Sequence, residues 1–134
     1  MSLIGKKKGR PTTRIHFDTI VKRFVVFLKR ELRLSYDISY VLIDDAEFSI
    51  KNKTFGMIDL KNKVIHLSIV NRHPIDILRT LAHEYVHLKQ LMNGKLMDGS
   101  AGSLTENEAN AKAGEVMRKY GKLHPELFDL MPIR

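Results

Sequence analysis

Two histidines stand four residues apart in the segment RTLAHEYVHLKQ, which spans residues 79–90, and a glutamate follows the first of them. Side chains four residues apart lie on one face of a helix, so His83 and His87 can bind the same ion. Glu84 lies about 100° further round the helix, where its carboxylate can reach a water molecule on that ion. This pattern predicts a metal site with its own general base. The competing interpretation is a solvent-facing amphipathic helix that carries two histidines.

A catalytic zinc site needs a third protein ligand and an open position for water. The chain has no cysteine, so any metal must be held by histidines and carboxylates. The last expected helix carries an apolar stripe made of Ala109, Ala113, Val116, Met117 and Tyr120. Helical spacing puts Glu106 on this stripe and Glu108 well off it, and a carboxylate on a packed face needs a positive partner such as zinc. Asn110, one turn after Glu106, is expected to contact the residues that hold the metal without binding the metal itself.

Glu106 also fits a different role at the start of its helix. Ser103 and Glu106 form the S-x-x-E pattern of a capping box, in which both side chains bind free backbone N–H groups. Thr105 and Glu108 form the same pattern. We expect the second pair to cap the helix and Glu106 to bind the metal.

The segment HEYVH is preceded by the hairpin sequence KNKVIHLSI and followed, nineteen residues after His87, by Glu106 in ENEAN. This order resembles the gluzincin type of zincin metallopeptidase, which has HExxH and a glutamate on the next helix. TLAHEYVH with ENEANAKAGE is particularly similar to the ImmA/IrrE-like group, and the order of hairpin and helices is similar to that of SprT-like domains. The resemblance covers roughly residues 55–120.

The resemblance implies an enzyme that hydrolyses peptide bonds of an intracellular protein. Zn²⁺ held by His83, His87 and Glu106 would polarise the scissile carbonyl and lower the pKa of its bound water towards about 7. Glu84 would take a proton from that water and pass it to the leaving amine. A purely structural zinc is the alternative, but it leaves Glu84 without a task.

The elements that must position these side chains follow from the hydrophobic periodicity of the chain. In order they are a helix from Asp18, as N-cap, to about Leu34, a β-rich run at 36–45, a short strand or connection at 46–50, a hairpin at 55–69, a helix from Pro74 to about Met92 and a helix from about 103 to 121. They predict an α+β fold, a small zincin-like domain with a short mixed sheet. The strand at 64–69 is expected to be an outer strand that holds an extended peptide across the metal.

The helix with both histidines must also bury a face against the core. Its apolar residues recur on the side away from the histidines, as Leu78, Leu81, Tyr85, Leu88 and Met92. Three further side chains are candidates for contact with a substrate or with the reaction centre. His66 either faces a substrate or is a half-buried strand residue, while His124 or Tyr120 would stabilise an oxyanion unless Tyr120 belongs to the core.

Residues 1–14 are basic and contain glycines, which predicts a flexible arm ahead of a single domain at 15–134. The formal net charge of +8 favours acidic partners such as nucleic acid, with solubility as the plain alternative. KKKGRP resembles the Gly-Arg-Pro core of AT-hook arms, which implies nucleic-acid contacts by Lys6, Lys7, Lys8 and Arg10; a solvated tail is the alternative. A nucleic-acid-binding module on the same scaffold without turnover is therefore the second hypothesis.

The remaining sequence features concern location. The basic start is not followed by the apolar run of a signal peptide, and no segment approaches the roughly 20 apolar residues of a membrane span. An intracellular, cytoplasmic protein without membrane contact is expected.

Overall fold

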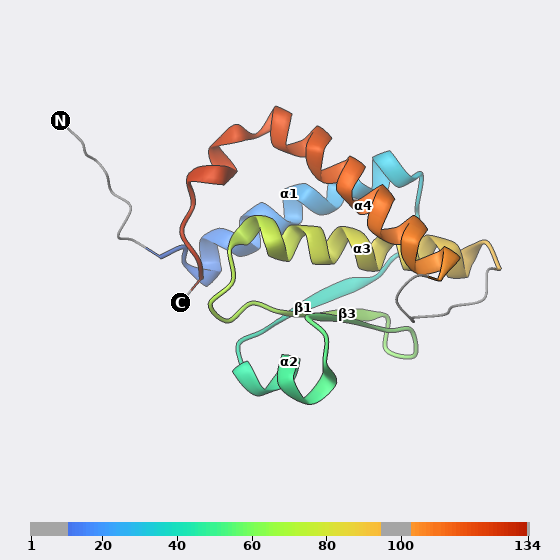
Figure 1. Cartoon of the computed structure of the whole chain (residues 1–134), viewed down its shortest axis with the longest axis horizontal. Helices are drawn as coiled ribbons and strands as arrows, with labels where there is room; N and C mark the ends of the chain where they lie inside the picture. Colours follow the sequence, from blue (N-terminus) through green and yellow to red (C-terminus); the bar gives the residue numbers. More distant parts are fainter. Residues whose placement is uncertain (1–10, 95–102, 134) are drawn as a thin grey trace.

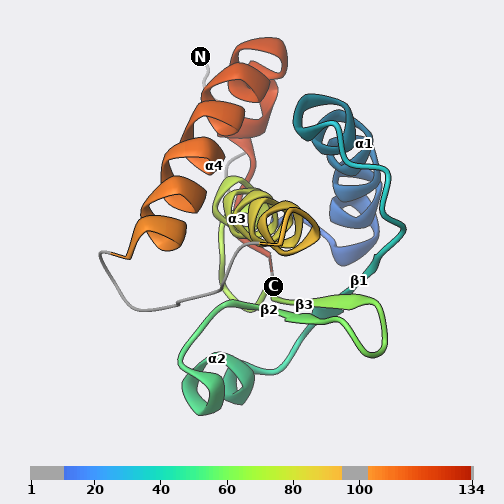
Figure 2. The same cartoon turned by 90° about the vertical axis from the view of Figure 1, so that its right-hand side faces the viewer.

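Helix α3 (Pro74–Met92) is the element around which the rest of the chain is arranged. The computed structural model describes residues 11–94 and 103–133. Figure 2 shows α3 end-on between α1 (Arg14–Leu32) and α4 (Leu104–Leu123), with a small sheet along another side. The described chain therefore has an α+β fold in which the helix that carries both candidate histidines is central.

Helix α3 begins and ends where the sequence predicts. The Nδ1 atom of His73 accepts a hydrogen bond from the N–H of Ile75, and Pro74 occupies the first turn, where no N–H is needed. Most residues expected on its core face are buried, namely Leu78, Leu81, Tyr85 and Leu88. Met92 is instead 52% exposed, because it is the last residue of the helix and lies beyond the core.

Three strands of the described chain form one mixed sheet in the order β1-β3-β2. Strand β3 (Val64–Ser68) pairs antiparallel with β2 (Gly56–Asp59), which confirms the hairpin, and parallel with β1 (Ser39–Ile43). Because β3 has a strand on each side, the prediction that residues 64–69 form an outer strand open to a peptide is wrong. The edge strand of the hairpin is β2.

The connection after β1 contains a short helix, α2 (Ala46–Asn52), where the sequence allows a short strand or a connection. The strand alternative is wrong because the Asp45 carboxylate accepts a hydrogen bond from the N–H of Glu47 and caps a helix. Helix α2 lies on the face of the sheet opposite α3 (Figure 1). The path from β1 to β3 through this helix and β2 supplies the length that parallel pairing needs.

Helix α1 begins at Arg14, ahead of the predicted N-cap Asp18. Thr13 is the actual cap, since its hydroxyl accepts a hydrogen bond from the N–H of His16. The Asp18 carboxylate instead accepts a hydrogen bond from the Tyr40 hydroxyl at 2.6 Å, and this contact lowers the pKa of Asp18. Asp18, which the local sequence predicts as the N-cap of α1, therefore bonds instead to a strand residue far along the chain.

Residues 12–14, which the composition assigns to the basic arm, belong to the folded part of the chain. Thr12 is buried, its hydroxyl donates a hydrogen bond to the carbonyl of Met131 at 2.5 Å, and its backbone pairs with Ile133. The C-terminal segment therefore lies beside the start of α1 (Figure 1). The predicted arm boundary is too late, and residues 1–10 lie outside the described residues.

The predicted apolar stripe of α4 is buried in full, as Ala109, Ala113, Val116, Met117 and Tyr120. After α4 the chain forms a short 3₁₀ helix, η2 (Pro125–Asp129). Leu127 and Ile133 are buried, which confirms that the tail packs on the domain. Within residues 11–94 and 103–133, no helix has both the length and the apolar character to cross a membrane.

Candidate metal centre

One ring nitrogen from each histidine of α3 faces the same carboxylate oxygen of α4. The Nε2 atom of His83 lies 2.5 Å from Oε1 of Glu106, and the Nε2 atom of His87 lies 3.3 Å from it. One potential ligand atom from each of the three residues lies within 4.8 Å of the other two. The fold thus brings together the three residues that the sequence predicts as ligands.

Helical spacing and helix packing together produce this arrangement. His83 and His87 are one turn apart, and their rings meet edge to face with centroids 4.5 Å apart. On α4, the buried Ala109 and Ala113 follow Glu106, and small side chains let packed helices approach closely. The side chains of His83, His87 and Glu106 remain 22%, 9% and 17% exposed, so the group is largely shielded yet reachable from solvent.

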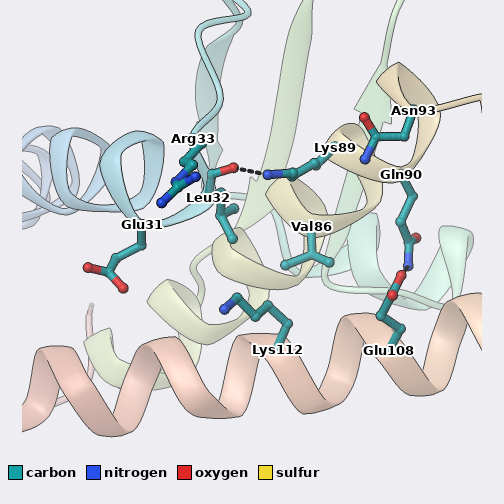
Figure 3. A pocket seen from close by; sticks show the side chains of 9 residues that line it. All are labelled: Glu31, Leu32, Arg33, Val86, Lys89, Gln90, Asn93, Glu108 and Lys112. Atoms are coloured by element: carbon teal, nitrogen blue, oxygen red, sulfur yellow. Dashed lines mark hydrogen bonds between the residues drawn. The ribbon is translucent and has the colours of Figure 1, made fainter.

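Gln90 orients the ring of His87. Its Oε1 lies 2.8 Å from Nδ1 of His87, while its Nε2 donates to the Thr105 carbonyl at 3.0 Å and to Oε1 of Glu108 at 2.5 Å. Figure 3 shows the Gln90 side chain reaching from α3 toward Glu108 on α4. Because the amide nitrogen already faces two acceptors, Oε1 must accept from His87, so the His87 ring carries its proton on Nδ1.

Glu84 lies beside Nδ1 of His83, as Gln90 lies beside Nδ1 of His87. Its Oε2 lies 3.3 Å from Nδ1 of His83, on the side of the ring away from Glu106. A carboxylate only accepts hydrogen bonds, so this Nδ1 carries a proton as well. The Glu84 carboxylate raises the pKa of His83, with Glu106 adding to the effect and partial burial opposing it. Glu84 is itself buried, and it contacts a ligand residue without joining the ligand group.

This donor set fits a divalent cation. With both Nδ1 atoms protonated, an imidazole in its neutral form directs the lone pair of Nε2 toward the carboxylate of Glu106. Lone pairs and a carboxylate repel one another unless a cation or a proton lies among them. Two imidazoles and one carboxylate form a ligand set that catalytic zinc sites use.

Glu106 combines the two roles that its sequence position allows. Its backbone N–H donates to the Ser103 hydroxyl at 3.1 Å, as in a helix cap, while its side chain turns to the histidines. The expectation that Thr105 and Glu108 form the cap is wrong, since Ser103 is the N-cap and Glu108 accepts from Gln90. The capping and metal-binding interpretations therefore concern different atoms of one residue.

A cavity of about 220 Å³ opens beside His83 and Glu84. We call it the inner cavity; its lining also includes Thr54, Phe55, Arg79, Thr80 and Asn110. Strand β2 closely approaches α3 here, because a Cβ at Gly56 would lie 2.7 Å from Cγ2 of Thr80 and 3.3 Å from Cγ of Glu84. Glycine at this position lets the sheet edge reach the candidate general base.

Asn110 and His66 occupy different places relative to this cavity. Asn110 lines it together with His83 and Glu84, and its contact with a metal ligand stays a prediction. His66 pairs in register with Met57, on the sheet face opposite Gly56, and its ring lies 6.3 Å from that of Phe48. It is half-buried in the strand and faces away from the centre, as the plainer interpretation predicts.

Tyr120 and His124 lie too far along the chain to serve the centre. Tyr120 comes fourteen residues after Glu106, which places it about 21 Å further along α4. It is buried against Phe24 and Phe27, which supports the core interpretation, and His124 caps the far end of the helix. Their predicted role as oxyanion stabilisers is therefore wrong.

The structure adds residues that the sequence interpretation omits. Gln90 is three residues after His87, and a glutamine at that spacing beside a candidate ligand is a usable signal. Gly56 and Arg79 give no such signal, because their positions beside the centre depend on tertiary packing. The candidate nucleic-acid residues Lys6, Lys7, Lys8 and Arg10 lie outside the described residues.

Comparisons of the chain with models of known protein families, with curated proteins and with solved structures found no match. The function of the chain is therefore inferred from the side-chain geometry of the centre. The resemblance to gluzincins remains a prediction from the sequence motifs.

Proposed function

We propose that the protein is a zinc-dependent metallopeptidase that hydrolyses peptide bonds of protein substrates. The observation that carries the proposal is the convergence of Nε2 of His83, Nε2 of His87 and Oε1 of Glu106, with Glu84 adjacent but outside the group. A structural metal site would not need a buried carboxylate beside an open cavity. The arrangement is that of three ligands and a general base.

Each residue of the centre has a distinct task in this proposal. His83, His87 and Glu106 bind the zinc ion, and Gln90 keeps the His87 ring oriented through Nδ1. Bound zinc supplies Lewis-acid chemistry, which polarises a carbonyl group and makes water more acidic. The Glu84 carboxylate accepts a proton from the attacking water and then donates it to the nitrogen of the leaving amine.

Strand β2 is the element that can align a substrate with these residues. It is an edge strand of the sheet, and the segment that leads into it, Thr54 and Phe55, lines the inner cavity with Glu84. An extended peptide can add to a free strand edge through backbone hydrogen bonds. We therefore place the scissile bond between the β2 edge and the His83 side of α3.

Metal analysis and one conservative variant test the proposal. The purified protein is expected to hold one zinc ion per chain and to cleave a denatured protein such as casein. Glu84→Gln should keep the zinc, because Glu84 is outside the ligand group, but lose at least about 100-fold in kcat, because the base is gone. Glu47→Gln, which removes a carboxylate from α2, is the matched control. Zinc loss or full activity in Glu84→Gln would contradict the assigned roles.

A further inference from the structure

Two arginines border the inner cavity and its continuation along the molecule. Arg79, one turn before His83 on α3, lines the inner cavity. It also lines a second cavity of about 230 Å³ between α3, α4 and η2, together with Arg118 and the apolar side chains Met117, Leu127 and Phe128. Because Arg79 lines both, the two cavities lie next to each other, with Glu84 on the wall of one and Arg118 on the wall of the other.

Both guanidinium groups are available for a ligand. Among the described residues, neither Arg79 nor Arg118 has an ion pair or a side-chain hydrogen bond, and both side chains are exposed. Arg72 provides the contrast: its guanidinium bonds to the Ser68 carbonyl and the Thr80 hydroxyl and lies 4.2 Å from the Phe55 ring centre. Arg72 therefore holds the cavity wall in place, whereas the other two arginines have no such partner in the part of the chain that the structure describes.

The charged residues that line the second cavity are both arginines, whereas the inner cavity contains Arg79 and Glu84. The residues that line the second cavity include no aspartate or glutamate, and Glu84 is the one acidic residue among those that line the inner cavity. An arginine binds a carboxylate through two parallel hydrogen bonds, which gives the contact both strength and direction. A negatively charged group that enters the second cavity would meet two guanidinium groups and no acidic lining residue.

We propose that Arg79 and Arg118 form a carboxylate-recognition subsite, and that the substrates are peptides with aspartate or glutamate close to one side of the scissile bond. The inference rests on the proposed peptidase function and names its substrate class. Arg79 is four residues from His83, about 6 Å along the helix axis. An extended peptide advances about 3.3 Å per residue, so Arg79 would bind an acidic side chain about two residues from the scissile bond. Arg118 would bind an acidic side chain still further from that bond.

The shape and lining of the cavities favour a peptide over a nucleic acid. Each cavity has room for one or two side chains, with about 220 Å³ and 230 Å³, which suits the side chains of a bound peptide. Phe55 lines the inner cavity, and Met117, Leu127 and Phe128 line the second, so apolar side chains next to the acidic one would also be accommodated. The subsite therefore fits an acidic residue within an otherwise apolar segment.

Equilibrium binding tests the subsite without requiring turnover. The full-length Glu84→Gln protein, with zinc and separately with a chelator, is titrated into two pools of fluorescent octapeptides. The pools are identical mixtures of neutral residues except for two central positions, which are both Glu in one pool and both Gln in the other. The Glu pool is expected to bind about fivefold more tightly, since ion pairs with exposed arginines contribute only a few-fold each to affinity.

Added substitutions identify the residues that produce the preference. Adding Arg79→Gln should reduce the preference for the Glu pool to about twofold or less, while Arg79→Lys should retain part of it. Arg118→Gln should have a smaller effect. Arg30→Gln, which removes the same charge from the exposed surface of α1, is the control for general electrostatic attraction and should leave the preference unchanged.

The outcomes separate this proposal from the peptidase function. Equal binding of both pools, or equal losses in the Arg79 and Arg30 variants, would overturn the subsite even if the protein hydrolyses peptides. A preference that depends on Arg79 in a protein without hydrolytic activity would support the subsite and reject the peptidase. Tighter Arg79-dependent binding of a ten-residue oligothymidylate than of the Glu pool would overturn it in favour of a nucleic acid.

Discussion

The two ends of α4 present the same face of one helix to different partners. At its start Glu106 meets two imidazole rings, with His83 Nε2 at 2.5 Å. Near its end Tyr120 packs against Phe24 and Phe27, with ring centroids 4.8 Å from each. Helical spacing puts both residues on one stripe, but the neighbouring element decides whether that stripe faces the candidate metal centre or the core.

Metal binding and the free energy of unfolding should therefore depend on different ends of this helix. Glu106 and Tyr120 are about 21 Å apart along the axis, and substitutions at such separations usually have independent effects. A change at the start of α4 should therefore alter metal binding, whereas a change near its end should alter the free energy of unfolding. The substitutions below test this division.

The largest expected effect follows from Glu106→Ala. Removing one of three protein ligands should lower zinc affinity on the order of 1,000-fold, because the roughly 10–16 kcal/mol of a zinc site is shared among its ligands. Competition titration with a chromogenic chelator measures the change. Glu115→Ala, which removes an exposed carboxylate from the same helix, is the control and should keep the affinity of the parent. Equal affinity in both variants would exclude Glu106 as a ligand.

Tyr120→Ala should have the next largest effect, and on a different quantity. The buried ring is lost from contact with two phenylalanines, which should reduce the free energy of unfolding by about 3 kcal/mol. Urea unfolding measures this loss, and zinc stoichiometry should stay at that of the parent under native conditions. If Tyr120→Ala weakened zinc binding as strongly as Glu106→Ala, the two ends of α4 would be coupled and the division would fail.

Gln90→Met tests the contact that ties the start of α4 to the centre. The variant loses the acceptor for Nδ1 of His87 and the donor to the Thr105 carbonyl, so zinc affinity should fall about 10- to 100-fold. Gln90→Glu keeps an acceptor for His87 and should recover part of this loss. An unchanged affinity in Gln90→Met would show that the orientation of His87 is set by other contacts.

The sequence predicts correctly those features that depend on spacing along one element. The limits of α3, the hairpin, the buried stripe of α4 and the shared face of His83 and His87 all follow from helix and strand periodicity. Predictions fail where a distant residue competes for a local group. Asp18 does not cap α1 because it accepts a hydrogen bond from Tyr40, and residues 64–69 do not form an edge because β1 pairs with them.

The sequence by itself determined which side chains share a helix face, because the rotation per residue is a property of the backbone. It therefore determined the pairing of the histidines and the placing of Glu106 on a packed stripe. Only the tertiary structure decided that this stripe meets the imidazoles, that Gln90 orients His87, and that Arg79 lines the cavity beside Glu84. Contacts between elements distant in sequence depend on how their surfaces pack, and spacing along one element does not encode that packing.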